Sequence, residues 1–99
     1  MTIDKDIVHR VAVVVNKRGL HARAAALVAR VAGQFEAEVT VSAKAEQVSA
    51  LSIMGMLMLG ANTGTKLQFD AHGSDAEEAA DALVHLVENG FEEDDFSDS

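Results

Sequence analysis

The chain has 99 residues, of which 48% are hydrophobic, and it contains no cysteine, tryptophan or tyrosine. This length suits a single domain, and the lack of cysteine excludes disulfides, cysteine-ligated zinc and a thiol nucleophile. Eight basic residues against 16 acidic ones give a formal net charge of −8, which argues against a general nucleic-acid binder.

Acidic residues are concentrated at the C-terminal end. Five of the 16 lie in residues 90–99, which hold no basic residue, so the rest of the chain is only mildly acidic. We expect residues 1–90 to form one domain and residues 91–99 to be an acidic, disordered tail. No stretch approaches 18 consecutive apolar residues, and the first six residues do not resemble a signal peptide. A cytoplasmic protein that neither spans nor binds a membrane is therefore expected.

The first half of the chain predicts a strand, a helix and a β-hairpin. Residues 7–15 are rich in β-branched side chains and predict a well-buried strand. Residues 21–32 are rich in alanine, the strongest helix former, and Gly33 follows as a stop signal. Residues 36–43 alternate between apolar and polar side chains, which predicts a half-buried strand with which residues 46–50 can pair.

The second half predicts a short helix, a strand and a longer helix. Residues 52–59 form an apolar segment that Ser52 can cap. Residues 65–71 alternate again, and residues 74–77 have the spacing of a capping box that opens a helix to about residue 88. The order is β-α-β-β-α-β-α with half-polar strands. It predicts an α+β open-faced sandwich, in which a four-stranded antiparallel sheet carries three helices on one face.

The four histidines differ in what they can do. No two of them have the spacing of three or four residues that a helical metal pair needs, so no metal site is expected. His9, His72 and His85 are expected to be ordinary surface histidines. His21 is different because it opens the predicted helix of residues 21–32, with no acidic residue nearby.

A histidine at a helix start faces an anion-binding environment. The first backbone N–H groups of the helix have no intrahelical partner, and the helix dipole is positive at that end. Arg23 adds a planar cation suited to phosphate, and Lys17 and Arg18 add positive potential. A nucleophilic histidine beside such a site suggests a covalent phosphohistidine. The spacing alone also allows a capping histidine with ordinary surface arginines.

Two longer motifs resemble one known family. Residues 19–25, Gly-Leu-His-Ala-Arg-Ala-Ala, resemble the active-site motif of HPr, the histidine-containing phosphocarrier protein of the phosphoenolpyruvate-dependent phosphotransferase system. Residues 52–55, Ser-Ile-Met-Gly, resemble that family's regulatory-serine segment, and residues 60–64 resemble the loop before its last strand. The resemblance runs from about Val8 to Glu88 without an evident gap.

The resemblance implies roles for particular residues. His21 would accept a phosphoryl group on Nδ1 from phosphorylated enzyme I and pass it to an enzyme II A domain, while Arg23 would pair with that group. Ser52 would be phosphorylated by the bifunctional HPr kinase/phosphorylase. Partners would dock on surface residues around both sites: Leu20, Ala22, Ala24, Ala26, Ile53, Met54, Leu57 and Met58. The protein would be a monomeric carrier rather than an enzyme, without cofactor or metal.

One departure and two alternatives accompany this interpretation. The family usually has proline where this chain has Ala24, which puts the rate of transfer in question. The chain could instead be a regulatory module of the same fold, which docks to metabolic or stress enzymes according to the phosphorylation state of Ser52. An independent enzyme is disfavoured because no catalytic triad or nucleotide-binding loop is present. The motifs do not decide between the sugar and nitrogen-related branches of the system.

Overall fold

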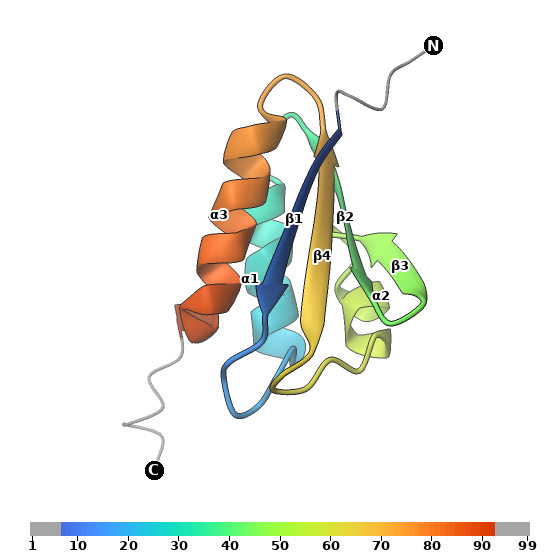
Figure 1. The fold of residues 1–99 in the computed structure, drawn as a ribbon, viewed down its shortest axis with the longest axis vertical. Coiled ribbons are helices and arrows are strands. Elements are labelled where there is room, and N and C mark those ends of the chain that lie inside the picture. Colours follow the sequence, from blue (N-terminus) through green and yellow to red (C-terminus); the bar gives the residue numbers. More distant parts are fainter. Residues whose placement is uncertain (1–6, 93–99) are drawn as a thin grey trace.

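The structure is a computed structural model that describes residues 7–92. Its elements follow the predicted order (Figure 1): β1 Ile7–Val13, α1 Ala22–Ala32, β2 Glu38–Ala43, β3 Glu46–Ser49, α2 Ile53–Met58, β4 Lys66–His72 and α3 Ala76–Glu88. A short 3-10 turn, η2, spans Gly90–Glu92. The βαββαβα order predicted from the sequence is confirmed.

The strands form one antiparallel sheet in the order β1-β4-β2-β3. Figure 1 shows α1 behind the sheet and α3 next to α1 along the β1 edge, with α2 behind the β2–β3 hairpin. The opposite face of the sheet is open to solvent. The predicted open-faced sandwich with three helices on one face is therefore confirmed.

Alternation along the strands places the core between sheet and helices. Side chains that point toward the helices are buried on β2 and β4, as the sequence pattern predicts: Val39, Val41, Ala43, Leu67, Phe69 and Ala71. The buried face of α3 consists of Ala76, Ala79, Ala80, Leu83, Leu86 and Val87. Small alanines let the helices lie close to the sheet, so a chain with few aromatic residues still builds a continuous core.

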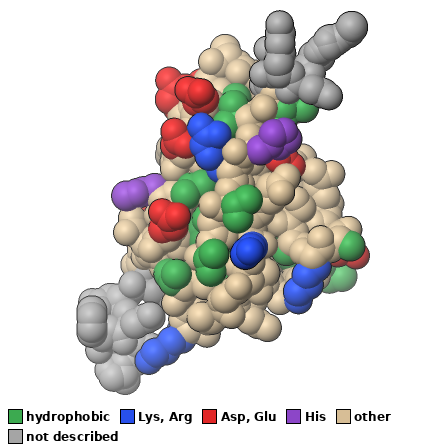
Figure 2. Space-filling model, in the orientation of Figure 1, with side chains coloured by type: hydrophobic (Ala, Val, Ile, Leu, Met, Phe, Trp, Pro, Cys, Tyr) green, Lys and Arg blue, Asp and Glu red, His purple; other side chains and the backbone are tan. Residues whose placement is uncertain are grey.

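The first strand is less buried than its composition predicts. It ends at Val13 rather than at residue 15 and lies at an edge of the sheet. Val11, Val13 and Val15 are exposed because no second layer covers the open face. Figure 2 shows this face, on which hydrophobic, charged and histidine side chains lie close together. A run of β-branched residues predicts a strand, but it does not reveal whether one face or both are covered.

The capping box predicted at residues 74–77 is not formed. Asp75, not Ser74, is the N-cap of α3, and its side chain makes no capping hydrogen bond. Its carboxylate instead accepts from the backbone N–H of Ala37 at 2.8 Å and of Glu36 at 3.0 Å. The approach to β2 is close at this point, because a Cβ added to Gly73 would lie 2.8 Å from the Cα of Ala37. Asp75 therefore joins α3 to the start of β2.

The packed domain extends past the predicted boundary at residue 90. Phe91 is 1% exposed and lies in the core, although its φ of 57° is unusual for a bulky residue. Burial of the ring offsets the cost of this left-handed backbone. Residues 93–99, which make up most of the predicted tail, lie outside the described residues.

Replacement of Asp75 by alanine is expected to lower the free energy of unfolding by about 1–3 kcal/mol, because the part-buried Ala37 N–H loses its acceptor. Ser74→Ala is the matched control and is expected to change it by less than about 0.5 kcal/mol. Urea unfolding followed by far-ultraviolet circular dichroism measures both, since the chain has no tryptophan or tyrosine. If Ser74→Ala lowered the free energy of unfolding more than Asp75→Ala does, the result would indicate that the capping box forms after all.

Candidate functional site

His21 is the N-cap of α1. Its backbone is extended, with φ −87° and ψ −176°, and its carbonyl accepts the first intrahelical bond from Ala25 N–H at 2.8 Å. Nδ1 of the imidazole accepts from the backbone N–H of Ala24 at 3.4 Å. A nitrogen that accepts this bond carries no proton, so the geometry favours the tautomer protonated on Nε2. Nδ1, the atom that the resemblance assigns to phosphate, therefore lies over the first turn of the helix.

The loop before His21 is paired with the loop before β4. Leu20 N–H donates to the carbonyl of Ala61 at 3.0 Å, and Gly64 N–H donates to the carbonyl of Val14 at 2.8 Å. Gly19 has a φ of 71°, and a Cβ at this position would lie 2.5 Å from the Ala61 carbonyl oxygen. Glycine is therefore required at this position for the two loops to approach one another.

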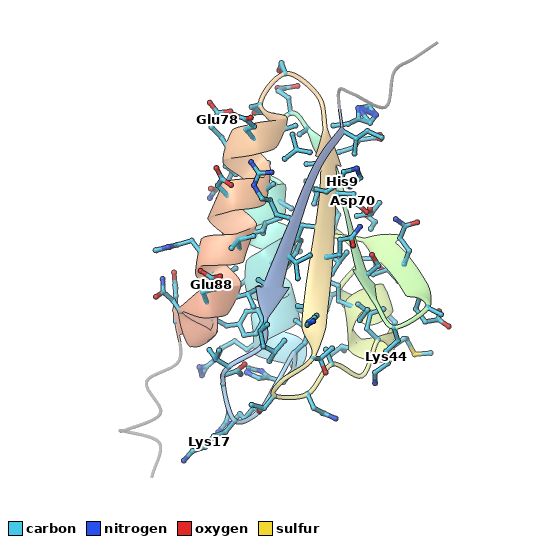
Figure 3. The ribbon with its side chains drawn as sticks, viewed as in Figure 1. His9, Lys17, Lys44, Asp70, Glu78 and Glu88 are labelled. Carbon is cyan, nitrogen blue, oxygen red and sulfur yellow. The ribbon has the colours of Figure 1, made fainter. Side chains whose placement is uncertain are left out.

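The start of α1 is electropositive. Its first turn holds no acidic residue, and the N–H groups of Ala22 and Arg23 precede the first intrahelical bond. Arg23 is exposed, as are Lys17 and Arg18 in the preceding loop. Figure 3 shows Lys17 at the end of the molecule where this loop turns. Backbone donors and a nearby guanidinium make this end suited to a phosphoryl group.

Ser52 caps the second helix in the same way. Its Oγ accepts from the backbone N–H of Gly55 at 2.9 Å, and its carbonyl accepts from Met56 N–H at 3.0 Å. A Cβ on Gly55 would lie 2.8 Å from the Ser52 Oγ and 3.1 Å from the Cβ of Val48. Glycine thus lets α2 lie against β3 and keeps the hydroxyl close to the helix start.

Most of the predicted docking residues are at the surface, but two are not. Met54 and Met58 are 68% and 77% exposed, and Ile53, Ala22 and Ala26 are also exposed. Leu57 is half-buried, whereas Met56 is fully buried. Leu20, in the loop before α1, and Ala24, on its first turn, are both buried in the core, so their side chains add no surface to the predicted patch. Leu51 is exposed beside Ser52, although the sequence pattern did not single it out.

The other histidines lie away from this site. His9 pairs with Asp70 on the open face of the sheet, where Figure 3 shows them together. His85 contacts the Asn89 side chain at 2.8 Å, and His72 is exposed. Within residues 7–92 no group of three or more His, Cys, Asp or Glu side chains could hold a metal ion. No described helix is long and apolar enough to cross a membrane.

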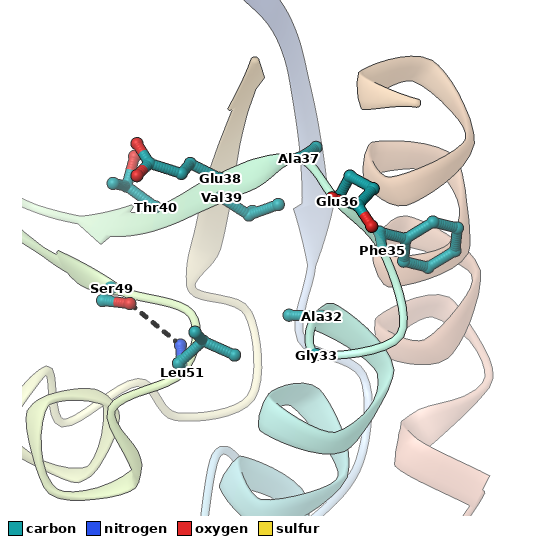
Figure 4. A pocket seen from close by; sticks show the side chains of 10 residues that line it. All are labelled: Ala32, Gly33, Phe35, Glu36, Ala37, Glu38, Val39, Thr40, Ser49 and Leu51. Atoms are coloured by element: carbon teal, nitrogen blue, oxygen red, sulfur yellow. Dashed lines mark hydrogen bonds between the residues drawn. The ribbon is translucent and has the colours of Figure 1, made fainter. Parts of the chain in front are cut away.

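A hollow lies at the far end of α1, between this helix and the strands β2 and β3 (Figure 4). Its walls include Ala32, Phe35, Val39 and Leu51. The figure also shows the Leu51 N–H bonded to the Ser49 Oγ at 3.0 Å. None of His21, Arg23 and Ser52 lines this hollow.

The open-faced sheet and the histidine cap define a small α+β domain that presents an imidazole at the electropositive start of a helix. A family model described as "PTS HPr component phosphorylation site" matches residues 8–89. The phosphocarrier protein HPr of Cupriavidus necator is 45% identical over 80 residues, which cover 81% of this chain and 90% of that protein.

Two further relatives support this similarity. The phosphocarrier protein NPr of Shewanella violacea is 42% identical over 78 residues, which cover 79% of this chain and 86% of that protein. The crystal structure of HPr-C-His from Thermoanaerobacter tengcongensis superposes with a TM-score of 0.82 at 40% identity, covering 88% of this chain and 98% of that one. The chain belongs to the HPr family. It is a bacterial phosphocarrier protein of the phosphotransferase system and not an enzyme.

Ala24→Pro is expected to keep α1 folded, because the N–H of a first-turn residue is not needed for the helix. It removes the donor to Nδ1 of His21, so the fraction of imidazole protonated on Nε2 is expected to fall. Nitrogen-15 NMR of the neutral ring measures this fraction. Ala24→Gly keeps the N–H and serves as control. Identical ring shifts in the proline variant and the wild type would show that the bond does not set the tautomer.

Proposed function

We propose that His21 carries the phosphoryl group, accepting it on Nδ1 from phosphorylated enzyme I and passing it to an enzyme II A domain. The observation that carries this proposal is the position of Nδ1 at the N-cap of α1, over a helix turn that holds no acidic residue. Membership of the HPr family implies enzyme I and enzyme II A domains as partners. The expected monomeric state and cytoplasmic location go with this role.

The transfer exchanges one bond to phosphorus for another. The Nδ1 lone pair attacks phosphorus as the bond between phosphorus and the donor breaks, and Nε2 keeps its proton. Passing the group on reverses these steps with the acceptor as the new nucleophile. Because the phosphoramidate bond is labile, the group can move in both directions with little net change in free energy.

The surroundings of His21 match the charge of the group. Once phosphorus is bonded to Nδ1, the Ala24 N–H loses its acceptor there and faces a phosphoryl oxygen instead. The N–H groups of Ala22 and Arg23, which precede the first intrahelical bond, can bind the remaining oxygens. The Arg23 guanidinium is exposed and two residues away, and it can pair with the dianion.

We further propose that Ser52 is a regulatory phosphorylation site for HPr kinase/phosphorylase. Its Oγ lies at the start of α2, next to the exposed side chains of Ile53 and Met54. These side chains and Met58 form a docking patch whose flexible thioethers can adapt to several partners. A phosphate on Ser52 adds negative charge at the edge of the docking patch, and this charge repels an acidic partner surface.

Incubation with phosphoenolpyruvate and cognate enzyme I is expected to label the wild type with acid-labile, base-stable phosphate and to leave His21→Ala unlabelled. Arg23→Ala is expected to be labelled about 10- to 150-fold more slowly, since a charge-assisted hydrogen bond contributes about 1.5–3 kcal/mol. Arg30→Ala, on the same helix, is the matched control for loss of one positive charge. A wild type that a competent enzyme I does not label would overturn the carrier proposal.

Variants of Ser52 separate its capping role from its regulatory one. Ser52→Ala loses the hydrogen bond to the Gly55 N–H, and its free energy of unfolding is expected to be about 1 kcal/mol lower than that of the wild type. Ser52→Asp and Ser52→Asn both keep a capping acceptor, so only charge distinguishes them. The Asp variant is expected to have a higher KM for phosphorylated enzyme I than the Asn variant.

Labelling with HPr kinase/phosphorylase and ATP tests the modification itself. Base-labile phosphate is expected on the wild type and not on Ser52→Ala. Equal KM values for the Asp and Asn variants would contradict the proposed charge effect. Kinase labelling of a chain that enzyme I leaves unlabelled would favour the regulatory docking module over the carrier.

A further inference from the structure

Asn16 is the only polar residue that is buried among residues 7–92, with 1% of its surface exposed. It lies in the loop between the end of β1 and His21. The junction of α3 and η2 covers it, since a Cβ added to Gly90 would lie 3.6 Å from the Asn16 Cβ. A buried amide is costly unless it is hydrogen-bonded, and an apolar side chain would avoid that cost. The bonds it makes therefore indicate what it does.

Asn16 binds both polar backbone groups of Gly19. The side-chain Nδ2 donates to the Gly19 carbonyl at 2.9 Å. The backbone carbonyl of Asn16 accepts from the Gly19 N–H at 3.3 Å. The segment is a tight turn with asparagine first and glycine fourth, the residues that such turns favour at these positions. Thr63 Oγ1 also donates to the backbone carbonyl of Asn16, and this bond fixes the turn to the loop before β4.

Gly19 in turn sets the backbone of His21. The Gly19 carbonyl that receives the Asn16 amide also accepts from the His21 N–H at 3.0 Å. One oxygen is therefore held by the buried amide and by the residue that carries the imidazole. Any movement of this carbonyl displaces the N-cap of α1 directly.

We propose that Asn16 is a positioning residue for phosphoryl transfer through His21, an inference that rests on the proposed function. By fixing the Gly19 carbonyl, the amide keeps Nδ1 and the N–H groups of Ala22 and Arg23 directed at the same phosphoryl group. Alignment of this kind is demanding, because a misplacement of about 1 Å can slow a reaction by about 100-fold. Because Asn16 is buried, its side chain offers no docking surface, so its effect falls on transfer within the complex and not on docking.

Asn16→Asp keeps the side-chain size but replaces the donor with an acceptor, and Asn16→Ala removes the amide. Both are expected to lower kcat for transfer from phosphorylated enzyme I by about tenfold or more, with KM unchanged. Val41→Ala is the control for a general loss of stability, because Val41 is buried on β2 outside this loop. It is expected to keep the wild-type kcat. The His21 amide resonance is expected to shift in the Asn16 variants only.

The outcomes distinguish failure of the Asn16 inference from failure of the proposed phosphoryl transfer through His21. If enzyme I does not label the wild type, the proposed function fails and the Asn16 inference fails with it. If the wild type is labelled, wild-type kcat in the folded Asn16 variants overturns the Asn16 inference alone. An equal loss of kcat in Val41→Ala, or a rise in KM without a change in kcat, also overturns it. If neither Asn16 variant folds, the amide serves the fold and not the site, and the inference is rejected.

Discussion

The antiparallel pairing of β1 with β4 is the constraint on which the site depends. This ladder places the end of β1 beside the start of β4, and its hydrogen bonds continue past the strands through Val14, which bonds to Thr65 and Gly64. The loop that carries His21 is therefore held beside the loop that precedes β4. The bond from Leu20 N–H to Ala61 extends the same pairing to the residue before the histidine.

The two sites use the same local geometry with different chemistry. His21 and Ser52 are both N-caps, and each accepts an N–H from the residue three positions further along its helix. The capping atom is also the atom proposed to bond to phosphorus. Phosphorylation exchanges one neutral acceptor for several anionic oxygens that face the same N–H groups and the same end of the helix dipole. Each helix start thus already has the geometry that the proposed modification requires.

The sequence predicted the features that depend on local pattern. Alternation in β2 and β4 identified the buried face, because only one face of this sheet is covered, and the motif around His21 placed it at a helix start. Features set by distant segments were missed. Asp75 looks like part of a capping box until β2 brings two N–H groups to its carboxylate. Asn16 reads as an ordinary turn residue, and only the fold shows that it is enclosed.

The hydrogen bond from Ala24 N–H to the imidazole is longer than the bonds that fix the backbone beneath it. The bonds that fix Gly19, Leu20 and His21 are 2.9–3.3 Å long, whereas the bond from Ala24 to Nδ1 is 3.4 Å. A long hydrogen bond orients the ring but is readily exchanged. This combination suits transfer, because the nucleophile must be aligned for attack, yet each new bond must also break when the next partner docks. Ala24, at the position where the family usually has proline, supplies this weak donor through its backbone N–H.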